Sequence, residues 1–232
     1  MLSDYRPKNR SLILGALAVA MILSLAVSTS VRFGHADVPA AATAADIQPL
    51  GAGDQAPYFS VETVDNRPFE FDPRNLARPV VLITFRGGWC PYCNLQLSEL
   101  RTVIPQIREL GVDVLFLSGD RAERLYDSLN RETQEAIDAL DYTILSDADA
   151  QAASALGIAF KAPDRVLIRR RNAAGDEFRG SSMARHGVLP VPAVFAIDAS
   201  GMITFAYANP DYRVRLSGDE LIAAASEIAP AS

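Results

Sequence analysis

Strong metal ligands are scarce in this 232-residue chain, which contains two cysteines and two histidines. A structural zinc site takes about four nitrogen or sulfur ligands. The cysteines would need both His35 and His186, and His35 lies beside an N-terminal hydrophobic segment. The sequence therefore argues against a metal site, and it also contains no motif for a flavin or a haem.

An excess of basic residues is absent as well. Lys and Arg number 22 against 28 Asp and Glu, which gives a net charge of −6. Domains that bind nucleic acid are commonly basic along at least one face. We therefore expect no nucleic-acid partner.

One long hydrophobic run stands out near the N-terminus. Arg6, Lys8 and Arg10 precede an apolar stretch from Leu12 to Val27. A positive flank followed by such a run is typical of a secretory signal or a signal anchor. The stretch Ser11–Val31 is long enough to span a bilayer.

The charges around this run predict where the rest of the chain lies. Basic residues before the run keep the N-terminus in the cytoplasm and direct the remainder across the membrane. Arg32 is unusual just before a cleavage site, so we favour an uncleaved anchor over a cleaved signal. We expect an exported domain, periplasmic or on the extracytoplasmic face of the membrane. The predicted parts are a signal peptide or membrane anchor (1–32), an Ala-, Pro- and Thr-rich linker (33–49) and a folded domain (50–230).

Both cysteines occur in one short segment, Arg86–Cys93, directly after the apolar run Val80–Phe85. Such a run is typical of a buried parallel strand. Helical spacing begins after Cys93, with one apolar face formed by Leu97, Leu100, Ile104 and Ile107. Cys90 is therefore predicted at an exposed helix start, with Pro91 at the first helical position. Unpaired N–H groups and the helix dipole stabilise a thiolate there.

A structural disulfide is the other interpretation of this pair. A bridge that closes so short a loop removes little entropy from the unfolded chain. Cys-x-x-Cys in an α/β context is instead a redox signature. We expect Cys90 to be the nucleophile and Cys93 to attack whatever bonds to it.

The remaining pattern predicts an α/β sandwich with a mixed central sheet flanked by helices. Expected strands are 59–63, 68–71, 80–85, 112–117, 142–145, 166–171, 193–197 and 202–207, and expected helices are 91–110 with a kink at Pro105, 121–140, 148–156 and a last one opening at Ser217. Hairpin turns are expected at Asp65-Asn66 and at Asp198–Gly201, and Ser217 with Glu220 predicts a capping box.

With these elements in order, the chain resembles the thioredoxin superfamily. More closely, it is similar to its alkyl hydroperoxide reductase/thiol-specific antioxidant branch, the peroxiredoxin-like proteins, from about Gly51 to Ile228. The resemblance rests on the segments Gly53–Phe59, Phe85–Asn94, Tyr142–Asp147, Ala155–Ile158 and Val191–Gly201.

The chain also departs from that pattern. Peroxiredoxins typically have Pro and Thr or Ser at the positions of Ile83 and Gly87, and their catalytic arginine is replaced here by Pro192. Thioredoxins have a buried Asp at the position of Thr84. The chain thus combines a thioredoxin-type Trp-Cys-x-x-Cys with a peroxiredoxin-type frame.

The resemblance implies a thiol-dependent peroxide reductase that needs no cofactor. Cys90 would reduce the peroxide, Cys93 would form the disulfide with it, and a thioredoxin-like donor would restore the dithiol. The alternative is a membrane-tethered thioredoxin-like reductase of protein disulfides, and a third possibility is a non-catalytic redox-sensing domain.

Four further residues are candidates for supporting roles. Arg86 is the nearest candidate to supply positive charge to the thiolate, although an arginine there is more often solvated. Trp89 is expected either to shield the thiolate or contact a partner, or simply to pack in the core. The resemblance implies a cis Pro192 beside the cysteines, with the backbone of Val191 left to hold a substrate.

Overall fold

The computed structural model describes residues 40–129, 131–140, 143–173 and 181–230. The predicted signal peptide or anchor, residues 1–32, lies outside the described residues, so both it and the predicted localisation stay predictions. Within the described ranges, no helix has the length and apolar character needed to cross a membrane.

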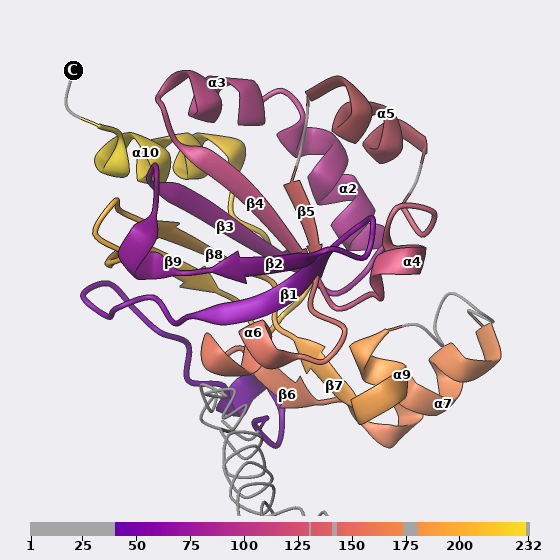
Figure 1. Cartoon of the computed structure of the whole chain (residues 1–232). Coiled ribbons are helices and arrows are strands. Elements are labelled where there is room, and N and C mark those ends of the chain that lie inside the picture. Colours follow the sequence, from indigo (N-terminus) through magenta and orange to yellow (C-terminus); the bar gives the residue numbers. More distant parts are fainter. Residues whose placement is uncertain (1–39, 130, 141–142, 174–180, 231–232) are drawn as a thin grey trace, which may run out of the picture. The chain divides into compact units, whose positions relative to one another are not determined.

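A mixed seven-stranded sheet forms the centre of the domain (Figure 1). Its strands lie in the order β2-β1-β5-β4-β3-β8-β9. They are β1 (Phe59–Thr63), β2 (Pro68–Phe71), β3 (Val80–Phe85), β4 (Asp113–Ser118), β5 (Thr143–Ser146), β8 (Ala193–Ile197) and β9 (Ile203–Ala208). The strands β3, β4 and β5 are parallel, whereas β8 and β9 run antiparallel to their neighbours. A separate antiparallel pair is formed by β6 (Ala159–Lys161) and β7 (Val188–Pro190).

Helices lie on both sides of this sheet (Figure 1). On one side are α2 (Pro91–Leu100), α3 (Ile104–Glu109), α5 (Arg131–Leu140) and α10 (Gly218–Ile228); on the other are α6 (Gln151–Ala155), α7 (Asp164–Ala173) and α9 (Ser182–His186). The short helix α4 (Ala122–Leu125) follows β4, and two 3₁₀ turns occur at Ala44–Asp46 and Pro73–Asn75. The predicted α/β class with a mixed sheet is confirmed.

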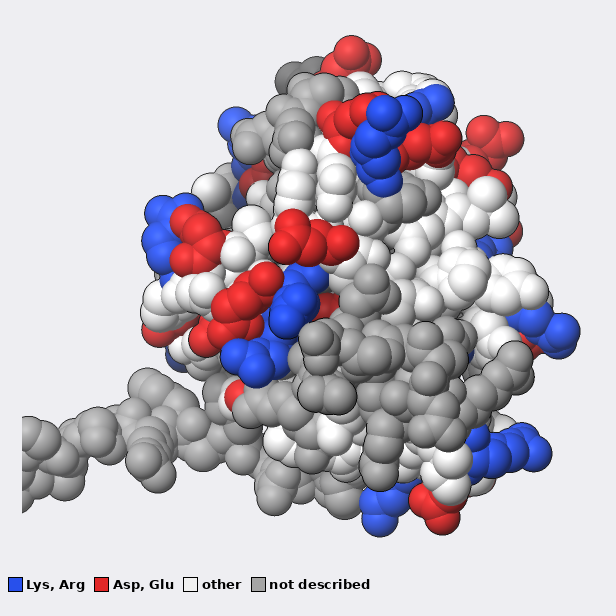
Figure 2. Space-filling view, turned by 90° about the vertical axis from the view of Figure 1, so that its right-hand side faces the viewer, with Lys and Arg blue, Asp and Glu red and all other residues white. Residues whose placement is uncertain are grey.

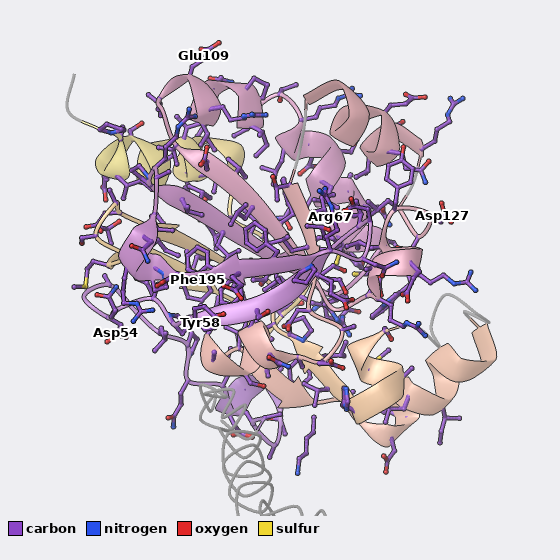
Figure 3. All side chains as sticks on the ribbon, viewed as in Figure 1. Asp54, Tyr58, Arg67, Glu109, Asp127 and Phe195 are labelled. Atoms are coloured by element: carbon purple, nitrogen blue, oxygen red, sulfur yellow. The ribbon has the colours of Figure 1, made fainter. Side chains whose placement is uncertain are left out.

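The core is built from the apolar strands and the inner helix faces. All six residues of β3 are buried, as the continuous hydrophobic run predicts. Phe195 in β8 is fully buried, whereas Glu109 and Asp127 point outward at the domain surface (Figure 3). The apolar helix face predicted from the sequence, Leu97, Leu100, Ile104 and Ile107, is also buried.

The surface carries both signs of charge. On the face that Figure 2 displays, basic and acidic side chains lie interspersed among uncharged ones. The surface ion pairs Arg121–Glu123 (2.8 Å) and Arg213–Asp211 (2.8 Å) likewise place opposite charges next to each other. In the described part of that face, charge of one sign does not dominate.

Several predicted elements were wrong in type or extent. The predicted strand 166–171 is part of α7: Pro163 precedes the helix and arginine favours it, and Val166 and Leu167 pack on the core. The predicted helix 91–110 is two helices, because Pro105 at the start of α3 has no N–H to continue the first one. The predicted helix 121–140 is likewise divided, into α4 and α5.

The described part of the predicted linker is packed against the domain. Ala41 pairs with Phe160 of β6 through a donated bond to Ala159 O (2.9 Å) and an accepted bond from Lys161 N (2.8 Å). Leu50 N donates to Leu156 O (3.1 Å). Residues 40–49 are therefore an ordered extension of the domain, which the lack of periodicity in their sequence does not indicate.

Candidate active site

The dithiol lies at the carboxyl end of β3, where the chain enters α2. Cys90 is the N-cap of α2 with extended backbone (φ −95°, ψ 111°), and Pro91 occupies the first turn. The Cys90 carbonyl accepts bonds from Cys93 N (3.0 Å) and Asn94 N (3.2 Å). The two thiols therefore belong to one helical turn, as the sequence predicts, and both are free.

Both sulfurs are buried, which corrects one expectation. Cys90 is only 1% exposed and Cys93 is 0% exposed, although an exposed Cys90 was predicted. Pro91 and the Tyr92 side chain (42% exposed) face solvent instead. The reason is tertiary: side chains from distant segments pack around the turn, and helix position alone does not reveal them.

Their shared environment separates the two thiols electrostatically. A hydrogen bond from the Cys93 thiol, assisted by the Cys93 N–H and by Arg86 and Arg215, lowers the pKa of Cys90 to about 6, against the opposing effect of burial. Burial raises the pKa of Cys93 well above its usual value, and the neighbouring Cys90 raises it further. Cys90 is thus the thiolate and Cys93 the hydrogen-bonded thiol, which supports their predicted roles.

Arg215 is a site residue that sequence reasoning missed. It lies between β9 and α10, and its Nη2 donates to Cys93 Sγ at 3.5 Å. Its Nη1 donates to Oε1 of the buried Gln96 at 3.0 Å. Arg215 is 122 residues from Cys93 along the chain and belongs to no motif, so the sequence offered no signal for it.

Asp120, in the loop after β4, was missed too. Its buried carboxylate accepts bonds from Gly88 N (2.7 Å), Trp89 Nε1 (3.1 Å) and Ser128 Oγ (3.1 Å). It thereby fixes the loop that precedes Cys90. Trp89 packs in the core with its indole N–H directed to Asp120.

Two glycines make this arrangement possible. Gly87 has a φ of +145°, and a Cβ there would lie 2.5 Å from Asp120 Oδ1. A Cβ on Gly88 would collide with the backbone oxygen of Ser128. The Thr or Ser typical of peroxiredoxins at position 87 is therefore incompatible with this loop, because the acceptor Asp120 occupies its place.

Arg86 is buried among aromatic rings rather than solvated. Its side chain is 8% exposed, and its guanidinium carbon lies 4.4 Å from the ring centre of Tyr212 and 5.4 Å from that of Trp89. Tyr212 also meets Tyr92 edge-on at 5.6 Å. These contacts hold the positive charge of Arg86 near Cys90, where it helps to lower the thiol pKa.

The Val191–Pro192 segment lies near the site but not in the expected form. None of the described peptide bonds is cis, so the predicted cis Pro192 was wrong. Val191 N donates to Ile158 O (2.9 Å), and Val191 O accepts from Thr84 Oγ1 (3.2 Å). Its backbone groups are used inside the protein, which contradicts the prediction that they hold a substrate. Pro192 lines a small recess together with Thr84, Gln96 and Arg215.

His186, the other histidine considered, faces the surface. Its Nε2 lies 3.2 Å from Asp149 Oδ1, and the two side chains are 43% and 53% exposed. Among the described residues, no group of three or more His, Cys, Asp or Glu side chains is arranged to hold a metal ion.

A thioredoxin-like sheet with a low-pKa Cys-x-x-Cys at a helix start defines a dithiol oxidoreductase. Within that class, residues 52–206 match the family model of the AhpC/TSA family, and the chain belongs to this family. Peroxiredoxin Bcp of Escherichia coli (strain K12) is 31% identical over 112 residues, which are 48% of this chain and 67% of that protein.

Two further likenesses bear on the site. The thiol-disulfide oxidoreductase ResA of Bacillus anthracis is 27% identical over 116 residues, 50% of this chain and 60% of that one. Among solved structures, reduced Prx3 from Vibrio vulnificus in complex with H₂O₂ aligns with a TM-score of 0.58 at 17% identity, covering 76% of this chain and 99% of that one. The structural likeness supports the thioredoxin-like fold predicted from the sequence.

Proposed function

We propose that the protein is a thiol-dependent peroxide reductase that cycles between the Cys90/Cys93 dithiol and its disulfide. The observation that carries the proposal is the placement of Cys90 at the N-cap of α2 with Cys93 one turn away, both buried, in surroundings that lower the pKa of Cys90 to about 6 and raise that of Cys93. Family membership and the similarity to peroxiredoxin Bcp support the same function.

The proposed cycle has three steps. The Cys90 thiolate attacks one peroxide oxygen, the O–O bond breaks, and the leaving oxygen takes up a proton, which makes Cys90 a sulfenic acid. Cys93 then attacks the Cys90 sulfur and expels the sulfenic oxygen as water. A thioredoxin-like donor reduces the resulting disulfide by thiol–disulfide exchange.

The hydrogen-bond donors that would stabilise the peroxide in this protein differ from those typical of peroxiredoxins. Gly87 and Pro192 stand where a hydroxyl and an arginine would be expected. Each such donor is typically worth on the order of 3 kcal/mol in the transition state. The Arg86 guanidinium and the Cys93 N–H are the groups placed to compensate, since both already stabilise negative charge on Cys90.

The test compares two substrates on one protein. The reduced full-length chain is mixed rapidly with hydrogen peroxide and, separately, with a protein disulfide, and the fluorescence of Trp89, the single tryptophan, reports the change at the dithiol. We expect Arg86→Ala to slow peroxide reduction at least tenfold more than disulfide exchange. Arg78→Ala, at the opposite end of β3 and 61% exposed, is the matched control and should change neither rate. Oxidation of wild-type Cys90 no faster than that of a free thiolate of equal pKa would exclude peroxide as the substrate.

Reduction of protein disulfides is the second candidate function. The similarity to ResA favours it, as does a Cys-x-x-Cys pair in which one thiolate attacks and the other thiol completes the exchange. If this function is the true one, the protein disulfide will react much faster than peroxide in the same experiment.

We also propose that the N-terminal segment anchors the domain on the extracytoplasmic face of a membrane. The support is the sequence pattern alone, a basic flank before one apolar run. In an oxidising compartment a dedicated reductant would have to keep the dithiol reduced, which makes a thioredoxin-like donor at the same location part of the proposal.

A further inference from the structure

We propose that Arg215 is the catalytic residue of the resolving step, in which its guanidinium stabilises the Cys93 sulfur as a thiolate. This inference rests on the proposed function, because it concerns the half-reaction that turns the oxidised Cys90 into the disulfide.

The resolving step places a demand on Cys93 that its surroundings oppose. Cys93 must lose its proton before it attacks, yet it is fully buried, and burial raises the pKa of its thiol. The position where thioredoxins have a buried Asp is Thr84, whose hydroxyl is already bonded to Ala193 N (2.9 Å) and Val191 O. Thr84 is therefore occupied and cannot act as a base for Cys93.

Arg215 supplies the opposing charge by direct contact. Its Nη2 lies 3.5 Å from Cys93 Sγ. A hydrogen bond to this sulfur is stronger when the sulfur is a negatively charged thiolate than when it is a thiol. Gln96 lies on the same helix as Cys93. Its Oε1 accepts a hydrogen bond from Arg215 Nη1 at 3.0 Å and so fixes the other arm of the guanidinium. The Nε of Arg215 is buried without a hydrogen-bond partner among the described residues, and the side chain as a whole is half-buried.

Oxidation of Cys90 makes this contact decisive. In the reduced protein two charged groups act on Cys93. The Cys90 thiolate favours the protonated form of Cys93, and Arg215 favours the thiolate form. The backbone N–H of Arg86 also favours the Cys93 thiolate. A sulfenic acid at Cys90 carries no thiolate charge. The opposition from Cys90 then disappears, and Arg215 faces only the effect of burial.

The chemistry balances without a further reactant. Cys93 gives up its proton, its sulfur forms a bond to Cys90 Sγ, and the S–O bond of the sulfenic acid breaks with its electron pair going to oxygen. The oxygen takes up a proton and leaves as water. In the reducing half-cycle a donor thiolate attacks Cys90 and Cys93 leaves as a thiolate, so the same guanidinium makes Cys93 the better leaving group.

The principal experiment separates oxidation from resolution. The full-length chain, as wild type, Arg215→Gln, Arg215→Lys and Arg213→Gln, is mixed with hydrogen peroxide while Trp89 fluorescence and trapping of the sulfenic acid by dimedone are followed. We expect Arg215→Gln to slow the peroxide-independent phase at least tenfold and to raise its pH midpoint, while the peroxide-dependent phase changes less than threefold. Arg215→Lys should recover part of the rate. Arg213→Gln, whose arginine pairs with Asp211 at the surface, should behave as wild type.

A second measurement does not depend on peroxide being the substrate. In the Cys90→Ser background, the thiolate absorbance of Cys93 is titrated with and without Arg215→Gln. The inference predicts a higher Cys93 pKa in the double variant, even if the peroxide experiment fails with the wild type. An unchanged Cys93 titration, or an unchanged resolving rate in an Arg215→Gln protein with the wild-type melting temperature, would overturn it.

Discussion

At the scale of single residues, the site divides its work between two thiols by giving them different surroundings. The Cys93 thiol donates to Cys90, and this bond is the largest cause of the lowered pKa of Cys90. Arg86 and Arg215 add positive charge from two different segments of the chain. Because a thiolate is the reactive form of cysteine, Cys90 is prepared to react at neutral pH while Cys93 waits as a thiol.

The first prediction concerns pH. The rate of Cys90 oxidation should rise as the pH rises through about 6 and should level off above it, since the thiolate fraction follows the lowered pKa. Cys93→Ala removes the hydrogen bond from the side chain and should move the midpoint upward. Cys93→Ser keeps a donor and is the control that should move it less. Equal midpoints in all three proteins would contradict the assigned cause.

A second prediction assigns the roles of the cysteines. Cys90→Ser should abolish reactivity with both peroxide and protein disulfides, because the low-pKa thiolate is lost. Cys93→Ser should instead accumulate a sulfenic acid with peroxide or a mixed disulfide with a protein, since the resolving thiol is missing. Mass spectrometry of the trapped species measures this, and stronger trapping by Cys90→Ser would reverse the roles.

At the scale of elements, the loop between β3 and α2 owes its form to a neighbouring loop. Asp120 follows β4, which is parallel to β3, so both loops leave the same edge of the sheet. The carboxylate binds Gly88 N and the Trp89 indole, and Gly87 and Gly88 leave room for this close approach. The sheet and helices of the family are thus retained, while the loop before Cys90 is shaped by the buried Asp120 carboxylate.

Gly88 provides the test of this packing. Gly88→Ala should destabilise the protein by about 1–3 kcal/mol, because a Cβ would meet the Ser128 backbone and could separate Gly88 N from Asp120. Gly51→Ala is the matched control, since no atom lies within 4 Å of its Cβ position. Denaturant unfolding of both variants measures the difference. Equal free energies of unfolding for the two variants would show that the loop containing Gly88 accommodates a Cβ without loss of stability.

The sequence was sufficient for the elements whose signals are local. The run Val80–Phe85, the turn at Asp198–Gly201 and the Ser217–Glu220 capping box all occur as predicted. Arg215 and Asp120 were not predictable, because what matters is their position in space, 122 and 31 residues from their partners Cys93 and Trp89. The expectation of a cis Pro192 came from the resemblance and not from the residues, and it was wrong for this chain.

At the scale of the whole molecule, the redox site lies on one domain, and the N-terminal pattern predicts that the domain works outside the cytoplasm. The described part packs as one unit from residue 40 onward, since Ala41 and Leu50 both bond to the domain. A tether would therefore have to lie before residue 40. That leaves the predicted anchor and the residues directly after it as the part that decides localisation.

The last prediction tests this arrangement in cells. A phosphatase reporter that is active only outside the cytoplasm, fused to the C-terminus of the full chain, should be active. Replacing Arg6, Lys8 and Arg10 by glutamate should reduce that activity, because the positive flank sets the orientation of the hydrophobic run. Replacing Lys161, Arg165 and Arg108, which lie within the described domain, should leave the orientation unchanged. Retention of the full-length mass in the membrane fraction would distinguish an anchor from a cleaved signal. A wild-type fusion active only with a cytoplasmic reporter would refute export.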